Sequence, residues 1–386
     1  MASRTADEVG PFTSLMRLIF KNILMHICIT LGVFGNILTL VVLLKKKMRH
    51  TSTAQYLTYL TFFDLIFIIS CFFNNLEIMY SNSKFIDEIK PFINLIFYPL
   101  GDFSANTSAY IILVFTIERY IAVAYPLNSL FWCRPSRARK IILATILFTF
   151  MLTFPTFLEN KIQFVYNPIN NSTKAELVES GFYPNFDMYK LIYFWIIAIM
   201  VQFIPLTLLI ILNSILMRYI HDSIKAKNVK LSLGEKTLST DGTKPSLELR
   251  VHRKSDFNIK NSVKNNVKNT SQQTDQNKAT ILLVATVVLF LVCQLPSALL
   301  LIYEAIFPLD NDVSSMNKDI RLGLNNIANG LTAINASVNF ILYSSFSDNF
   351  RQTVRTLFLN DKKNNQKINN KNAFYNKLRS NSNYHS

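Results

Sequence analysis

Long runs of apolar residues, separated by shorter polar segments, recur seven times along the chain. Each run is long enough for a helix that crosses a bilayer, which needs about 20 mostly apolar residues. The runs are continuous rather than alternating, so they predict helices and not the strands of a membrane barrel. They cover approximately residues 23–44, 54–79, 92–124, 140–158, 189–219, 278–305 and 321–343.

The expected fold class is therefore an all-α membrane protein, a seven-transmembrane helix bundle. Composition agrees with this, because 50% of the 386 residues are hydrophobic and only 17% are charged. We expect five segments. They are an extracellular N-terminus (1–22), the bundle (23–343), a disordered third cytoplasmic loop within it (220–277), a short amphipathic helix (344–360) and a disordered cytoplasmic tail (361–386).

The amphipathic helix after the seventh run is expected to lie in the membrane interface. Phe350, Val354 and Leu357 recur there at three- and four-residue spacing, with Arg351 and Arg355 on the other side. That pattern is typical of a helix with one apolar and one basic face.

Basic residues predict how the bundle lies in the membrane. With the N-terminus outside, the cytoplasmic loops and tail would hold most of the 40 Lys and Arg residues, including Lys45, Lys46 and Lys47 directly after the first run. The positive-inside rule predicts this distribution. We expect a multi-pass protein of the plasma membrane whose net charge of +16 contacts anionic lipid rather than nucleic acid.

A charged pair lies at the end of the third run, in the triplet Glu118, Arg119 and Tyr120. Charge is expensive inside a membrane, so an Arg beside a Glu there predicts a partner and a role.

Polar residues also lie within the runs, around one carboxylate, Asp64. A carboxylate among hydroxyls and amides could hold sodium or a proton deep in the bundle. Alternatively, these groups tie helices together by hydrogen bonds, each contributing about 0.6 kcal/mol. The expected polar pocket, with Asp64 as its metal ligand, comprises Asn36, Asp64, Ser108, Asn335 and Asn339.

These motifs together resemble the rhodopsin-like (class A) G-protein-coupled receptors. The resemblance covers all seven runs and the helix that follows them. The end of the fourth run (154–159) and the stretches 204–213 and 333–343 are further similar to invertebrate FMRFamide-type neuropeptide receptors. The matching motifs are Gly35 and Asn36, the stretch 60–65 around Asp64, the triplet 118–120, Pro205, the segment 293–296 and the segment 339–343.

The resemblance implies a mechanism. Glu118 would hold Arg119 at rest, and Arg119 would face a heterotrimeric G protein once the sixth helix moves outward. Pro296 removes a backbone hydrogen bond and would kink that helix. The expected switch residues are Pro205, Phe290, Gln294, Pro296, Asn339 and Tyr343.

The chain departs from the family pattern at identifiable positions. Asn94 stands where the family usually has a Cys, and the 159–188 loop has no Cys, so the usual outer disulfide is missing. Gln294 replaces a Trp and Phe340 replaces a Pro, as in the FMRFamide-type subgroup. Asn213 stands where a Tyr often contacts the released Arg.

The ligand class can be narrowed by single positions. Gly101 stands where amine receptors carry an Asp, and Ala333 stands where opsins carry a Lys, so both classes are disfavoured. The outer rim is acidic, which favours a cationic peptide, for example an RFamide-like amidated neuropeptide. Candidate ligand contacts are Glu77, Tyr98, Asp102, Gln294, Tyr303, Glu304 and Asn325.

Other function classes fit less well. A receptor of the same class for a non-peptide small ligand remains the alternative. A transporter or channel would want charged residues along a path, and one mid-span Asp does not supply one. The five His residues are dispersed and no catalytic set is visible, so we expect no enzyme and no cofactor beyond an allosteric sodium ion. Asn170 and Asn171 open glycosylation sequons in the 159–188 loop.

Overall fold

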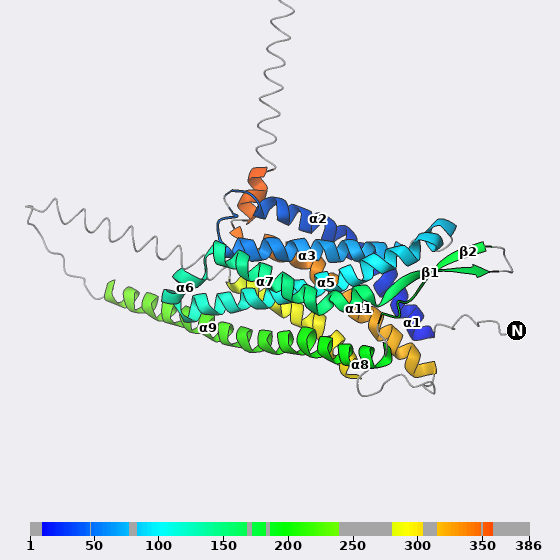
Figure 1. The fold of residues 1–386 in the computed structure, drawn as a ribbon. Helices are drawn as coiled ribbons and strands as arrows, with labels where there is room; N and C mark the ends of the chain where they lie inside the picture. Colours follow the sequence, from blue (N-terminus) through cyan, green and yellow to red (C-terminus); the bar gives the residue numbers. More distant parts are fainter. Residues whose placement is uncertain are drawn as a thin grey trace, which may run out of the picture.

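The computed structural model describes residues 10–46, 48–76, 83–167, 172–182, 186–238, 280–303, 315–348 and 350–357. Its helices lie side by side in one bundle, with a β-hairpin at one end and the short helix α6 at the other (Figure 1). We call these two ends the hairpin end and the α6 end. Among the described helices, six are long and apolar enough to cross a membrane.

The first crossing is one helix of three parts, α1 (Pro11–Met16), the π-helical η1 (Arg17–Leu24) and α2 (Met25–Leu43). It begins well before residue 23, which corrects the expected boundary of the N-terminal segment. The apolar spacing of Phe12, Leu15, Met16 and Ile19 continues the helical pattern into this stretch.

The described helices that follow run from Ser52 to Thr153. α3 (Ser52–Asn74) starts where Thr51 accepts a hydrogen bond from the Ala54 N–H, a side-chain N-cap. α5 (Lys84–Ala124) is 41 residues long and passes through Pro91 and Pro99 without a break. α6 (Pro126–Trp132) and α7 (Pro135–Thr153) each begin with a proline in the first turn, where its missing N–H costs nothing.

Beyond α7, the short η2 (Phe154–Leu158) leads into a hairpin of β1 (Asn160–Asn167) and β2 (Ser172–Glu179). The two strands pair antiparallel, with Phe164 opposite Ala175. Gly181, at φ 70°, then turns the chain, a conformation that favours glycine.

The fifth crossing consists of α8 (Phe186–Ile197), the π-helical η3 (Ala198–Phe203) and α9 (Ile204–Leu238). α9 runs to Leu238, so the first part of the 220–277 segment is helical, which corrects the expectation of a disordered loop there. Residues 239–277 lie outside the described residues, as do residues 358–360 of the expected amphipathic helix and the whole expected tail, 361–386.

The last two crossings are the helix Thr280–Tyr303, yellow in Figure 1, and α11 (Ser315–Phe346). α11 carries six asparagines, Asn317, Asn325, Asn326, Asn329, Asn335 and Asn339, and does not reach the hydropathy of the other six crossings.

The helix at residues 350–357 does not lie free of the bundle. Phe350 is 1% exposed and belongs to the main hydrophobic core, with its ring 6.3 Å from that of Tyr343. Val354 and Leu357 pack against the same core. This corrects the expectation of a purely interfacial helix, because its apolar face packs on protein.

Candidate functional site

The charged pair at the α6 end is buried within α5. Arg119 donates through Nη2 to Glu118 Oε1 at 2.8 Å, and the two side chains are only 8% and 5% exposed. The same nitrogen lies 3.5 Å from Ser52 Oγ on α3. The guanidinium also lies 5.5 Å from the Phe115 ring, one turn earlier on α5. Since a buried guanidinium needs a counter-charge, this pairing holds Arg119 inside the bundle.

The pairing leaves polar capacity unused. Glu118 Oε2 and Arg119 Nε are buried and have no hydrogen-bond partner among the described residues. Asn213 on α9 is also buried, and neither its Nδ2 nor its Oδ1 atom has a hydrogen-bond partner among the described residues. Tyr120, the third residue of the triplet, takes no part, because its ring packs edge-on against Tyr125. Within the triplet, the structure therefore pairs Glu118 with Arg119 and leaves Tyr120 outside that pair.

The second site surrounds Asp64 in the middle of the bundle. Its carboxylate is 2% exposed and accepts hydrogen bonds from Ser108 Oγ at 2.8 Å and Asn339 Nδ2 at 2.6 Å. Ser108 lies on α5 and Asn339 on α11, so this one carboxylate connects three helices. Asn36 on α2 joins the cluster indirectly, by donating to the backbone oxygen of Ala336 at 3.0 Å.

Three buried amide oxygens on α2 and α11 lack donors. The Oδ1 atoms of Asn36, Asn335 and Asn339 are buried, and none finds a hydrogen-bond partner in the described part of the chain. Asn335 and Asn339 are four residues apart and therefore lie on one face of α11. Carboxylate and amide oxygens without donors are the ligands that a hard cation such as sodium prefers. No cluster of three or more His, Cys, Asp or Glu residues that could hold a metal occurs among the described residues.

The expected switch residues lie at several levels of the bundle, and one of them, Asn339, belongs to the Asp64 cluster. Phe290 is 4% exposed and packs in the main core together with Tyr110 and Leu209. Tyr110 donates through its hydroxyl to the Met200 backbone oxygen in η3 at 2.5 Å.

Gln294 participates through its backbone, because Gln202 Nε2 of η3 donates to the Gln294 carbonyl oxygen at 3.0 Å. Pro205 is buried near the start of α9, and Pro296 lies six residues beyond Phe290 in the helix Thr280–Tyr303. Tyr343 is 1% exposed, and its hydroxyl has no partner among the described residues.

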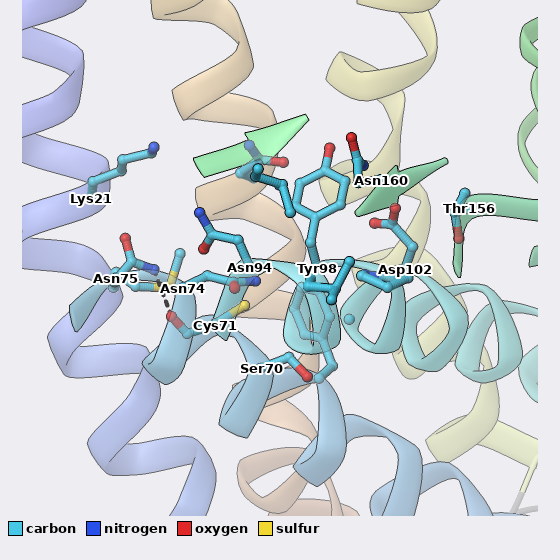
Figure 2. A pocket seen from close by; sticks show the side chains of 17 residues that line it. Lys21, Ser70, Cys71, Asn74, Asn75, Asn94, Tyr98, Asp102, Thr156 and Asn160 are labelled. Carbon is cyan, nitrogen blue, oxygen red and sulfur yellow. Dashed lines mark hydrogen bonds between the residues drawn. The ribbon is translucent and has the colours of Figure 1, made fainter. Parts of the chain in front are cut away.

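A pocket of about 520 Å³ opens at the hairpin end between four crossings. Its walls come from η1 and α2, α3, α5, α11 and the hairpin region (Figure 2). Such a volume is typical of ligand sites, which range from about 300 to 1,000 Å³. Its polar lining includes Lys21, Asn74, Asn94, Tyr98, Asp102 and Asn329.

Only some of the predicted ligand contacts line this pocket. Tyr98 and Asp102 line this pocket, whereas Gln294, Tyr303 and Asn325 do not. Glu77 and Glu304 lie outside the described residues, as do the sequon residues Asn170 and Asn171. All four cysteines, Cys28, Cys71, Cys133 and Cys293, are free thiols.

Sequence reasoning missed Lys21, Asn74 and Asn329 as lining residues. Lys21 was assigned to a segment outside the bundle, although the apolar spacing around it extends the first helix. Asn74 and Asn329 come from distant parts of the chain, and only the packing of α3 against α5 and α11 brings them together.

Residues 35–343 match the family described as 7 transmembrane receptor (rhodopsin family). The chain is 26% identical over 338 residues to the FMRFamide peptide receptor frpr-18 of Caenorhabditis elegans, a match that covers 85% of this chain. It is 25% identical over 344 residues, 87% of the chain, to the FMRFamide receptor of Drosophila melanogaster.

A third relative is the thyrotropin-releasing hormone receptor of Homo sapiens, 25% identical over 330 residues, which cover 85% of this chain and 75% of that receptor. The matched region spans 66% of the length of the Caenorhabditis elegans relative and 53% of that of the Drosophila melanogaster relative.

Proposed function

This chain belongs to the rhodopsin family of 7 transmembrane receptors, and from that premise we propose that it binds an extracellular neuropeptide and activates a heterotrimeric G protein. The peptide would enter at the hairpin end and the G protein would bind at the α6 end. The relatives named for FMRFamide and for thyrotropin-releasing hormone support a peptide ligand. An RFamide-like amidated peptide is the finer form of this proposal.

The proposed orientation places the hairpin end outside the plasma membrane. Exposed basic residues gather at the α6 end, where Lys45, Lys46 and Arg49 follow α2 and Arg134 and Arg139 begin α7. Anionic lipid on the cytoplasmic leaflet attracts such residues. The bundle then presents Arg119 toward the cytosol and the pocket toward the outside.

The observation that carries the proposal is the buried pair of Arg119 and Glu118. In this arrangement the guanidinium is closed off by Glu118, Ser52 and Phe115. The unused polar atoms of Glu118, Arg119 and Asn213 make the closed arrangement incomplete. An open arrangement, in which a G-protein segment supplies partners, would recover those hydrogen bonds.

Ligand binding would reach Arg119 by shifting an equilibrium between closed and open bundles. η3 is placed to transmit that shift, because it is hydrogen-bonded to both neighbouring helices. Its Met200 backbone oxygen accepts from the Tyr110 hydroxyl of α5, and its Gln202 side chain donates to the Gln294 backbone oxygen of the sixth crossing. Pro296 removes one backbone hydrogen bond from that crossing and allows the half of the helix nearer the α6 end to tilt. A ligand drives the change only as far as it binds the open bundle more tightly than the closed one.

The Asp64 cluster would bind sodium in the closed bundle. The orphan oxygens of Asn36, Asn335 and Asn339 and the Asp64 carboxylate form a donor set that fits this ion. The ion would neutralise the buried carboxylate and stabilise the arrangement in which α3, α5 and α11 converge on it. Sodium would then oppose agonist binding.

The test is ligand-dependent nucleotide exchange. Membranes from cells that express the full chain are mixed with a purified G protein and screened with amidated neuropeptides. Exchange that depends on both chain and peptide supports the proposal. Nucleotide exchange driven only by non-peptide ligands would support a receptor function but contradict a peptide ligand. Solute flux without any nucleotide exchange would favour a transporter.

A further inference from the structure

The pocket at the hairpin end has different chemistry on its two sides. Figure 2 shows Lys21, Asn74 and Asn75 on one side, and Asp102, Asn160 and Thr156 on the other. A ligand that fills this space therefore meets a basic wall from the first crossing and an acidic wall from α5.

The acidic wall is suited to a cation. The Asp102 carboxylate makes no hydrogen bond or ion pair with any residue that the structure describes, and it points into the pocket (Figure 2). Glu159, at the end of η2, lies close enough to act on it as a like charge. Two neighbouring carboxylates in a partly dehydrated pocket favour a cationic group between or beside them.

The opposite wall offers both a donor and an acceptor. Lys21 can donate from η1, although it already takes part in another interaction. Asn74 Oδ1 is buried and has no donor among the described residues, so it requires an N–H group. Asn75 Nδ2 donates instead to the Cys71 backbone oxygen at 2.7 Å.

A primary carboxamide satisfies both requirements of this wall. Its oxygen accepts from Lys21 and its N–H groups donate to Asn74 Oδ1. A carboxylate would pair with Lys21 but would face the Asn74 oxygen with a second acceptor, leaving that atom without a donor. The wall therefore distinguishes an amidated chain end from a free acid.

We infer that this pocket holds one end of a ligand in a fixed orientation, with a cationic group on Asp102 and a terminal carboxamide between Lys21 and Asn74. The inference rests on the proposed peptide receptor function and assigns the site, the end of the peptide that enters it and its direction. The first crossing is thus part of the ligand site.

The wall that carries Lys21 is held in place by α11. Phe12 and Phe20, which both precede Lys21 in the first crossing, pack against Gly323 and Gly330 of α11, where an added Cβ atom would lie only 2.3 Å and 2.5 Å from their rings. Asp319 accepts the N–H groups of Phe12 and Thr13 at the start of the helix. The basic wall is therefore built on a fixed element, as selective recognition requires.

The charge arrangement is testable without any ligand, because the Cys71 thiol lines the same pocket. Cationic aminoethyl and anionic sulfonatoethyl methanethiosulfonates are reacted with the full chain, and the Cys71→Ser variant supplies the background. We expect Asp102→Asn to lower the ratio of cationic to anionic labelling rates roughly fivefold, and Lys21→Gln to raise it. The matched controls Asp87→Asn and Lys84→Gln, exposed on α5 outside the pocket, should leave it unchanged.

Equal ratios in all variants, or no labelling of Cys71 by either reagent, would overturn the inference. The orientation is then tested with the tetrapeptide Phe-Met-Arg-Phe amide, its free acid and its citrulline analogue. Citrulline should weaken binding to the wild type about tenfold or more and should cost little further in Asp102→Asn. The preference for amide over acid should shrink in Asn74→Leu.

The failures of the two proposals are distinguishable. If no peptide binds while the labelling ratios follow the charges, the peptide function is wrong and the pocket's polarity stands. If the tetrapeptide binds and both preferences survive in the variants, the peptide function stands and the assigned orientation is wrong.

Discussion

Thr13, near the start of the first crossing, is hydrogen-bonded to Asp319, near the start of α11. The Thr13 backbone N–H donates to Asp319 Oδ1 at 2.8 Å, and its hydroxyl donates to the Asp319 backbone oxygen at 2.7 Å. Thr13 is only 1% exposed. A residue more than 300 positions away thus caps the first turn of the helix that forms one wall of the pocket.

This contact predicts a pH dependence of stability. Hydrogen bonds from Thr13 and Phe12 hold the pKa of Asp319 below its ordinary value of 3.8. Because the pKa is lower in the folded state, the stabilisation is complete above that ordinary value and is lost as the pH falls through the folded-state pKa. We expect the difference in melting temperature between the wild type and Asp319→Asn to be largest near pH 6 and to shrink below about pH 4. A difference in melting temperature that is constant across this pH range would show that the negative charge of Asp319 does not contribute to stability.

The packing of Phe20 on Gly330 predicts a size-compensation experiment. A Cβ atom at residue 330 would lie 2.5 Å from the Phe20 ring, closer than side chains approach. Gly330→Leu should lower the free energy of unfolding by about 1–3 kcal/mol, and Phe20→Ala in the same chain should recover part of that loss. Ile341→Leu, at an exposed position of α11, is the control. Additive losses in the double variant would show that the two residues do not pack as described.

The Asp64 cluster predicts a stabilisation specific to sodium. At a sodium concentration ten times Kd, the closed bundle should gain about 1.4 kcal/mol, which raises the melting temperature by a few degrees over an equal concentration of choline. Asp64→Asn should abolish this gain because it removes the charged ligand of the ion. Asp87→Asn, an exposed carboxylate on α5, should retain it. An equal sodium response in all three chains would return Asp64 to a purely structural role.

Local features of the sequence predicted much of the fold. Hydrophobicity is a property of each run alone, so all the crossings were found. The pairing of Glu118 with Arg119 was also predicted, because adjacent opposite charges within a membrane have few other partners.

The ends of the helices were predicted less well. The first helix already begins at Pro11, before the apolar run at 23–44, and residues 220–238 are polar yet continue α9. The hairpin was missed even though Ile162, Phe164 and Tyr166 alternate with other side chains in β1, a signal of strand structure.

The pocket could be predicted only in part. Asp102 and Tyr98 were recognised because one helix carries both. Lys21, Asn74 and Asn329 are brought beside them by the packing of four separate crossings, which no local pattern reports. The orphan oxygen of Asn74 depends on where its neighbours lie, so the preference for a carboxamide follows from the structure alone.

The most direct test of the account needs no ligand and concerns the release of Arg119. Glu118→Gln removes the buried counter-charge 2.8 Å from the guanidinium and should destabilise the closed bundle by roughly 1–3 kcal/mol, shifting the closed-to-open ratio several-fold or more. Basal nucleotide exchange in purified G protein should rise with this variant. It should fall to background when Arg119→Ala is added, whereas Arg139→Ala, exposed at the same end, should leave the rise in place. Exchange that does not rise in Glu118→Gln, or that persists without Arg119, would contradict the account.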